Sequence, residues 1–129
     1  MDKKLVEIEA AVKNKDFEAI ISFSTKFTFL FKLLRNFRAE GHRVLIFSMS
    51  KKNLDLIEEI IQSGYLGKDE DGDHVKYMRI DGNTEISERE SMCNEFNKDT
   101  KQFLGLLTTK VGGMGLNLAG ADRAIIMDP

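Results

Sequence analysis

Tryptophan is absent from this chain of 129 residues, and proline and cysteine occur once each. The single cysteine, Cys93, has no intrachain partner, which excludes a disulfide-stabilised scaffold and favours a reducing intracellular compartment. No apolar run approaches the ~20 residues that span a membrane. The first residues also lack the apolar segment of a signal peptide. We therefore expect no membrane partner.

Charged residues are abundant, but neither sign dominates. They make up 31% of the chain and hydrophobic residues 42%, which is typical of a folded globular domain. The formal net charge of −2 argues against a protein that binds nucleic acid with its whole surface. It leaves open a narrow basic edge that contacts DNA.

Apolar segments with the pattern of buried strands alternate along the chain with segments of helical period. The expected strands are 43–48, 75–80, 103–107 and 123–127, and the expected helices are 24–40, 51–63 and one opening near Ser87, with two shorter helices within 1–21. Crossovers of this length predict an α/β domain with a parallel sheet flanked by helices. We expect a helical lead-in over 1–21 and one domain over 22–129.

The helix near Ser87 has a recognisable start signal. Ser87 and Glu90 stand at the spacing of a capping box, in which each side chain binds a backbone N–H of the first turn. Met92, Cys93 and Phe96 then fall on the inward side. Cys93 is accordingly interpreted as a core residue rather than a nucleophile.

Polar residues follow the expected strands at their carboxyl ends, where ligands bind in open parallel sheets. They are Ser48, Asp81-Gly82, Thr108-Thr109 and Asp128. Short hydroxyl side chains and bare glycine backbone suit anionic oxygens. This edge therefore predicts a phosphate-rich ligand, although Asp81 could instead fix its own turn.

The glycine-rich segment 106–118 admits three interpretations. Gly113 and Gly115 supply half of the dinucleotide fingerprint G-x-G-x-x-G, but Leu118 stands where the third glycine belongs. No P-loop string G-x-x-x-x-G-K-[ST] occurs in the chain. The remaining interpretations are a phosphate or nucleotide contact and a turn whose glycines only permit tight packing.

Several segments together resemble the motifs of Swi/Snf-type ATPases. Residues 106–118 (LLTTKVGGMGLNL) and 120–129 (GADRAIIMDP) resemble motif V and the segment after it. Residues 41–48 resemble motif IV, and residues 78–84 with Arg89 resemble the segment that follows it. The resemblance covers roughly residues 22–129 and looks closest to the Rad26/Cockayne syndrome B group and the Plk-interacting checkpoint helicase group. Met49 departs from it, since the family usually has glutamine there.

The resemblance implies a RecA-like three-layer domain, the second lobe of an ATP-dependent double-stranded DNA translocase, truncated before motif VI. Such proteins remodel chromatin or repair DNA in the nucleus. The implied partners are double-stranded DNA, an N-terminal RecA-like lobe of the same polypeptide, and chromatin or nucleosomes.

The resemblance also assigns roles to individual residues. It implies DNA-backbone contacts by Ser48, Arg89, Thr108, Thr109 and Lys110, and an ATP cleft lined by Gly113, Gly115 and Asn117, with Asn117 at the ribose hydroxyls. It assigns no catalytic residue and no metal ligand to this chain. Two alternatives stay open: Ser48 could cap the following helix, and Arg89 could pair with Glu85 or Glu88.

The expected ATPase activity depends on sequence motifs that the chain lacks. Phosphoryl transfer by such motors needs a P-loop lysine, a magnesium-bound aspartate and an arginine finger. The chain contains neither a P-loop nor an Asp-Glu-x-His string. We expect the parent protein to hydrolyse ATP with magnesium. This fragment alone is expected neither to hydrolyse ATP nor to bind it stably. A non-catalytic α/β binding module and a dinucleotide-binding domain remain as alternatives.

Overall fold

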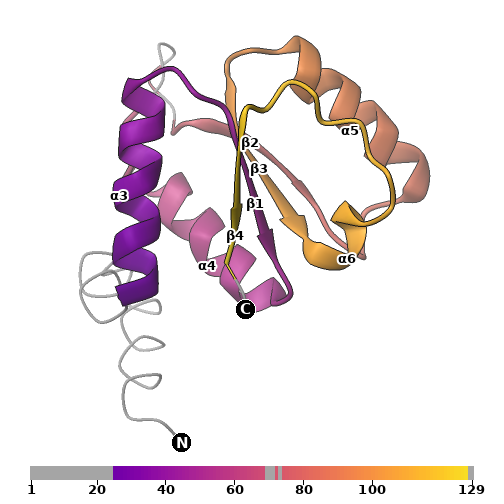
Figure 1. Ribbon diagram of the computed structural model, residues 1–129, viewed down its shortest axis with the longest axis horizontal. Helices are drawn as coiled ribbons and strands as arrows, with labels where there is room; N and C mark the ends of the chain where they lie inside the picture. Colours follow the sequence, from indigo (N-terminus) through magenta and orange to yellow (C-terminus); the bar gives the residue numbers. More distant parts are fainter. Residues whose placement is uncertain (1–24, 69–71, 73, 128–129) are drawn as a thin grey trace, which may run out of the picture.

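The computed structural model describes residues 25–68, 72 and 74–127 (Figure 1). The two short helices expected within 1–21 and the strand-end residue Asp128 lie outside the described residues. In the described ranges, no helix is long and apolar enough to cross a membrane.

Four parallel strands form one sheet, with helices on both faces (Figure 1). The strands are β1 (Val44–Ser48), β2 (Lys76–Ile80), β3 (Gln102–Thr108) and β4 (Arg123–Ile126), and the helices are α3 (Thr25–Ala39), α4 (Lys51–Gln62), α5 (Ile86–Lys98) and α6 (Thr109–Gly112). The strand order in the sheet is β2-β3-β1-β4. The predicted α/β fold with a parallel sheet flanked by helices is therefore confirmed.

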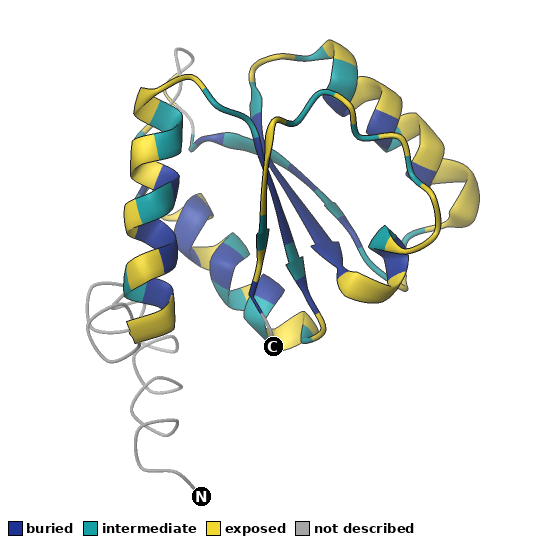
Figure 2. Ribbon diagram, viewed as in Figure 1, coloured by how far each residue is buried: buried dark blue, intermediate teal, exposed yellow. Residues whose placement is uncertain are grey.

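The core consists of two apolar layers, one on each face of the sheet (Figure 2). On β1, Val44 and Ile46 pack toward α3 and α4, whereas Leu45 packs toward α5 and α6. This alternation is that of a central strand covered on both faces. Cys93 and Phe96 of α5 are buried, as predicted, and Met92 is half-buried. By contrast, β4 lies at an edge of the described sheet, and Ile126 on it is exposed.

The predicted capping box at Ser87 is wrong. Helix α5 begins at Ile86, its N-cap residue is Glu85, and no side chain caps it. The turn before the helix is the physical reason. Thr84 N–H donates to the Asp81 carbonyl, and Glu88 N–H and Arg89 N–H both donate to the Glu85 carbonyl. The chain therefore enters the helix two residues earlier, and Ser87 lies exposed in the first turn.

Arg43 joins the segments that meet at the amino edge of the sheet. Its guanidinium donates to four backbone carbonyls, those of Phe96, Asp99, Gln102 and Gly120. The guanidinium carbon also lies 4.1 Å from the centre of the Phe96 ring. One half-buried side chain thus ties α5, the start of β3 and the approach to β4 together.

Candidate nucleic-acid interface

The carboxyl edge of the sheet brings the strand ends together, because the strands are parallel and in register. Ser48 at the end of β1 pairs with Thr108 at the end of β3, and Ile80 of β2 pairs with Leu107. The turn at 81–84, the first turn of α4 and helix α6 therefore leave the sheet at the same edge (Figure 1).

Helix α6 presents Thr109 and Lys110 to solvent, and its opposite side packs against the core. Val111 is buried against the α5 layer. Gly112 faces the Phe47 ring so closely that a Cβ there would lie 2.4 Å from a ring carbon. These two contacts fix the short helix, so that Thr109 and Lys110 point away from the core as exposed residues. Thr108 is buried at the end of β3 and has no side-chain cap bond to α6.

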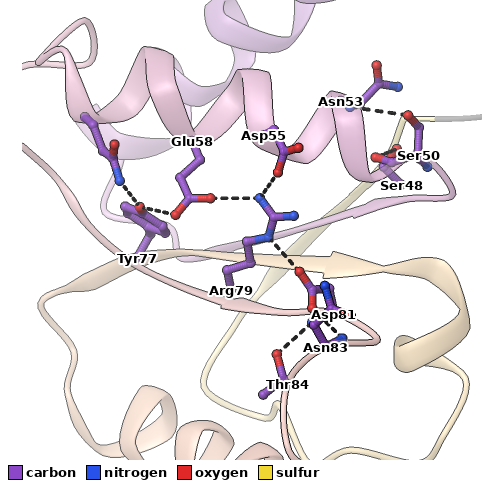
Figure 3. Close-up of polar contacts among 11 residues, drawn as sticks. Ser48, Ser50, Asn53, Asp55, Glu58, Tyr77, Arg79, Asp81, Asn83 and Thr84 are labelled. Carbon is purple, nitrogen blue, oxygen red and sulfur yellow. Dashed lines mark hydrogen bonds and ion pairs between the residues drawn. The ribbon is translucent and has the colours of Figure 1, made fainter.

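Ser48 has no exposed surface, and its hydroxyl belongs to a backbone turn (Figure 3). It accepts from Ser50 N–H at 3.1 Å and donates to the Ser50 carbonyl at 3.3 Å. Ser50 is the N-cap of α4 and accepts from Asn53 N–H. Ser48 therefore supports the capping residue instead of capping the helix itself, and it fixes where α4 presents the exposed Lys51 and Lys52.

Asp81 organises the turn that follows β2, as the alternative interpretation predicted (Figure 3). Its Oδ1 accepts from Asn83 N–H at 2.8 Å, and its own N–H donates to Thr84 Oγ1 at 3.1 Å. Its Oδ2 accepts from Arg79 Nε at 3.1 Å. The carboxylate is engaged on both oxygens by its own segment.

Arg79 connects this turn to helix α4, a network that sequence reasoning missed (Figure 3). Its Nη1 lies 2.5 Å from Asp55 and 2.8 Å from Glu58. Glu58 also accepts from the Tyr77 hydroxyl at 2.6 Å. Burial and this bond to Glu58 raise the pKa of Tyr77 to about 12, so the phenol stays a donor at neutral pH. The period of two residues in a strand was the available signal, since it places Tyr77 and Arg79 on one face of β2 and Asp81 follows two residues after Arg79.

The Asp81 carboxyl should make the fold sensitive to acid. Partial burial alone would raise its pKa, but the bond from Asn83 N–H and the charges of Arg79 and Lys51 outweigh burial and lower it. A lowered folded-state pKa adds stability above the ordinary value of about 4 and loses it as pH falls below that value. As pH falls below about 4, the free energy of unfolding of Asp81→Asn should therefore decrease less steeply than that of wild type. Urea denaturation across pH measures this, with exposed Glu59→Gln on α4 as control; equal acid slopes for Asp81→Asn and wild type would contradict it.

Arg89 crosses the carboxyl edge on the α5 side and is buried. Its Nε donates to the Thr84 carbonyl at 3.0 Å, and its Nη1 lies 3.3 Å from the Met114 sulfur. Neither Glu85 nor Glu88 pairs with it, and its side chain enters no ion pair within the described ranges. The exposed basic residues at this edge are therefore Lys51, Lys52 and Lys110.

The glycine loop runs from the carboxyl edge back toward the amino edge, so Gly113 and Asn117 lie at different places along it. Gly113 N–H donates to the Thr109 carbonyl, which keeps Gly113 beside α6. Gly115 has a φ of +76°, a conformation that glycine adopts at little cost. Asn117 instead meets the far end of α5, where its carbonyl accepts from Asn97 Nδ2 at 3.0 Å.

A cavity of about 360 Å³ lies between the glycine loop and α5, lined by Glu90, Cys93, Asn94, Gly115, Leu116 and Asn117. Amide groups and a carboxylate suit hydroxyl groups such as those of a ribose. The Glu90 carboxylate does not suit a triphosphate, and the lining contains no cation to offset one. The residues present thus fit the sugar of a nucleotide but not its phosphates.

Comparison with known proteins gives consistent matches. The helicase conserved C-terminal domain matches residues 25–129. The SNF2 domain-containing protein ENL1 of Oryza sativa subsp. japonica is 46% identical over 107 residues, which cover 82% of this chain and 10% of that protein. The DNA repair and recombination protein RAD26 of Saccharomyces cerevisiae is 43% identical over 98 residues, 76% of this chain and 9% of that protein. The chain thus spans about a tenth of the length of these relatives.

Among solved structures, the C-terminal part of the Fun30 ATPase domain superposes on this chain with a TM-score of 0.71 and 32% sequence identity. The match covers 82% of this chain and 32% of that one.

Proposed function

The chain belongs to the helicase conserved C-terminal domain family, in its Swi/Snf branch, and we propose that it is the second RecA-like lobe of an ATP-dependent double-stranded DNA translocase. The family and the RecA-like fold expected from the sequence are confirmed. In the proposal, the lobe contributes DNA-backbone contacts and one wall of the ATP cleft. It does so for a nuclear protein that acts in chromatin remodelling or DNA repair.

The arrangement at the carboxyl edge carries the proposal. Thr109 and Lys110 are exposed there on a short helix whose other face is fixed by Val111 and Gly112. A hydroxyl donor beside an ammonium group is the pairing that holds backbone phosphates without reading bases. Lys51 and Lys52 add charge from the start of α4.

The remaining residues that the sequence assigned to DNA contacts lie beneath the exposed edge. Ser48, Thr108 and Arg89 are buried. We assign them to the support of Thr109 and Lys110 and not to direct phosphate contacts. This division explains how a chain with a formal charge of −2 can hold DNA along one narrow rim.

The proposed ATP contact is limited to the sugar side of the nucleotide. Gly113 and Gly115 leave the loop without side chains, and Asn117 with Asn94 lines the cavity with amide groups. Bound ATP would supply the free energy of translocation, and its phosphates with magnesium would be held by the partner N-terminal lobe. We therefore expect this chain alone to be inactive as an ATPase.

Lys110→Glu should weaken binding to double-stranded DNA about tenfold at low salt and lower the slope of log affinity against log salt by about one. The reason is the loss of one phosphate contact and the introduction of a repulsive charge. Fluorescence anisotropy with a short duplex at several salt concentrations measures both quantities.

Lys101→Glu is the matched control for this experiment. Lys101 is also exposed but lies in the turn before β3, at the amino edge. Both variants carry the same net charge, so a general electrostatic effect would weaken them equally. Equal losses would place the DNA elsewhere and contradict the proposed edge.

A further inference from the structure

Met114 is an exposed methionine, with 60% of its surface accessible, whose sulfur nevertheless has a specific partner. The sulfur lies 3.3 Å from Nη1 of Arg89. The backbone of Met114 donates to the Val111 carbonyl at 3.0 Å, and glycines flank the residue on both sides. The Arg89 contact therefore joins the glycine loop to the start of α5.

The donor side of this contact is held in place. Arg89 Nε donates to the Thr84 carbonyl, and Thr84 belongs to the turn that Asp81 and Arg79 fix. A guanidinium has five N–H donors. In Arg89, Nε donates to a carbonyl and Nη1 to a thioether. A thioether is a weak acceptor, so the site can accommodate a stronger one.

We propose that Met114 is an oxidation site, in which Arg89 holds the sulfoxide and tightens the glycine loop. A peroxide is the oxidant. Its O–O bond breaks, one oxygen forms an S–O bond with the Met114 sulfur, and the other leaves as water or an alcohol. The sulfur loses two electrons and the peroxide is reduced by two. The sulfoxide oxygen then accepts from the Arg89 guanidinium, a charge-assisted bond stronger than the original contact.

Accessibility separates Met114 from the other reactive sulfur near the loop. Cys93 is buried, and burial together with the Glu90 charge raises the pKa of its thiol. The thiolate is the form of cysteine that attacks a peroxide oxygen, so the buried Cys93 thiol should react slowly. Met49, exposed to 73%, is the matched control, because it lies on the segment after β1, whereas Arg89 bonds to Thr84 and Met114.

The experiment treats the chain with hydrogen peroxide, maps oxidised methionines by mass spectrometry, and follows amide hydrogen exchange of residues 113–116 without DNA. Oxidation should slow this exchange about tenfold, as one added hydrogen bond to a charged group predicts. Methionine sulfoxide reductase should reverse the change. In Met114→Leu, the amides of residues 113–116 should exchange faster than in wild type, and peroxide should not change their exchange rate. In Met49→Leu, peroxide should slow the exchange of these amides as it does in wild type.

Unchanged or faster exchange in the chain oxidised at Met114 would overturn the proposal, as would an equal response in Met114→Leu. The consequence for DNA rests on the proposed function, so it is measured separately by anisotropy with the oxidised chain. Slowed exchange with unaltered DNA affinity would support the Arg89–Met114 contact and show that the DNA edge at Thr109 and Lys110 does not depend on the loop. Slowed exchange together with altered affinity would support both the contact and the proposed DNA edge.

Discussion

Replacing Arg43 with methionine should lower the free energy of unfolding by about 3–5 kcal/mol, a large share of the roughly 5–15 kcal/mol that stabilises a typical domain. Methionine keeps much of the side-chain length but loses the guanidinium that lies over the Phe96 ring. It removes every donor to the carbonyls of Phe96, Asp99, Gln102 and Gly120. Each carbonyl that stays buried without a partner costs about 1–3 kcal/mol, and water can restore only some of them.

The structure leaves little room for repair around the missing guanidinium. At Gly120 a Cβ would lie 2.7 Å from Arg43 Nη1 and 2.9 Å from the Asn97 backbone, so the loop is already packed closely on that side. Urea denaturation of both proteins measures the effect. Arg123→Met is the control, because Arg123 also lies near an aromatic ring but is largely exposed, and it should cost at most about 1 kcal/mol. A loss for Arg43→Met no larger than the control's would show that the carbonyls are readily satisfied by water.

The fold could be predicted from the sequence because its strongest signals are local. Strand β1 is an uninterrupted apolar run covered on both faces, and α4 has its apolar residues on one side, so both were placed within one residue of their observed ends. Gly41, just after the end of α3, has a φ of +81°, the left-handed conformation in which glycine often ends a helix. The capping pattern at Ser87 misplaced the start of α5 because the turn just before the helix, held by Asp81 and Thr84, brings the chain into the helix earlier.

The candidate site was predictable only in part, because exposure depends on packing across the sheet. The carboxyl-edge position of Thr108 and Thr109 follows from strand ends alone. The exposure of Thr109 depends on the packing of Gly112 against the Phe47 ring, a contact between segments distant in sequence. The burial of Ser48 and Arg89 accompanies short-range hydrogen bonds, to the Ser50 backbone and to the Thr84 carbonyl, that the strand and helix patterns do not encode. Asn117 is separated from Gly113 because the loop must return to the amino edge to begin the parallel strand β4.

The 129-residue chain in isolation should hydrolyse no ATP, with or without double-stranded DNA. It contains no P-loop string to hold the β- and γ-phosphates and no Asp-Glu-x-His string to hold magnesium. The cavity beside Asn117 offers a carboxylate where a triphosphate would require cations. Since the arginine finger alone contributes ~10³–10⁵ to the rate in such enzymes, a chain without the phosphate cradle should not exceed the uncatalysed background.

A coupled-enzyme assay with saturating duplex DNA measures this rate, and Asn117→Ala distinguishes the sources of any signal. Asn117 is exposed, and its main-chain carbonyl, which bonds to Asn97, is kept in the variant. The variant loses only the exposed bond from Ala119 N–H to the Asn117 side chain, so the fold should survive. A residual rate that is equal in wild type and Asn117→Ala comes from a contaminating ATPase. It leaves the proposed division of the ATP cleft between two lobes unchallenged. A DNA-stimulated rate that disappears in Asn117→Ala would mean that this lobe cleaves ATP by itself. In that case the phosphates are held at the glycine loop and not by a partner lobe, and the division of the ATP cleft between two lobes is wrong.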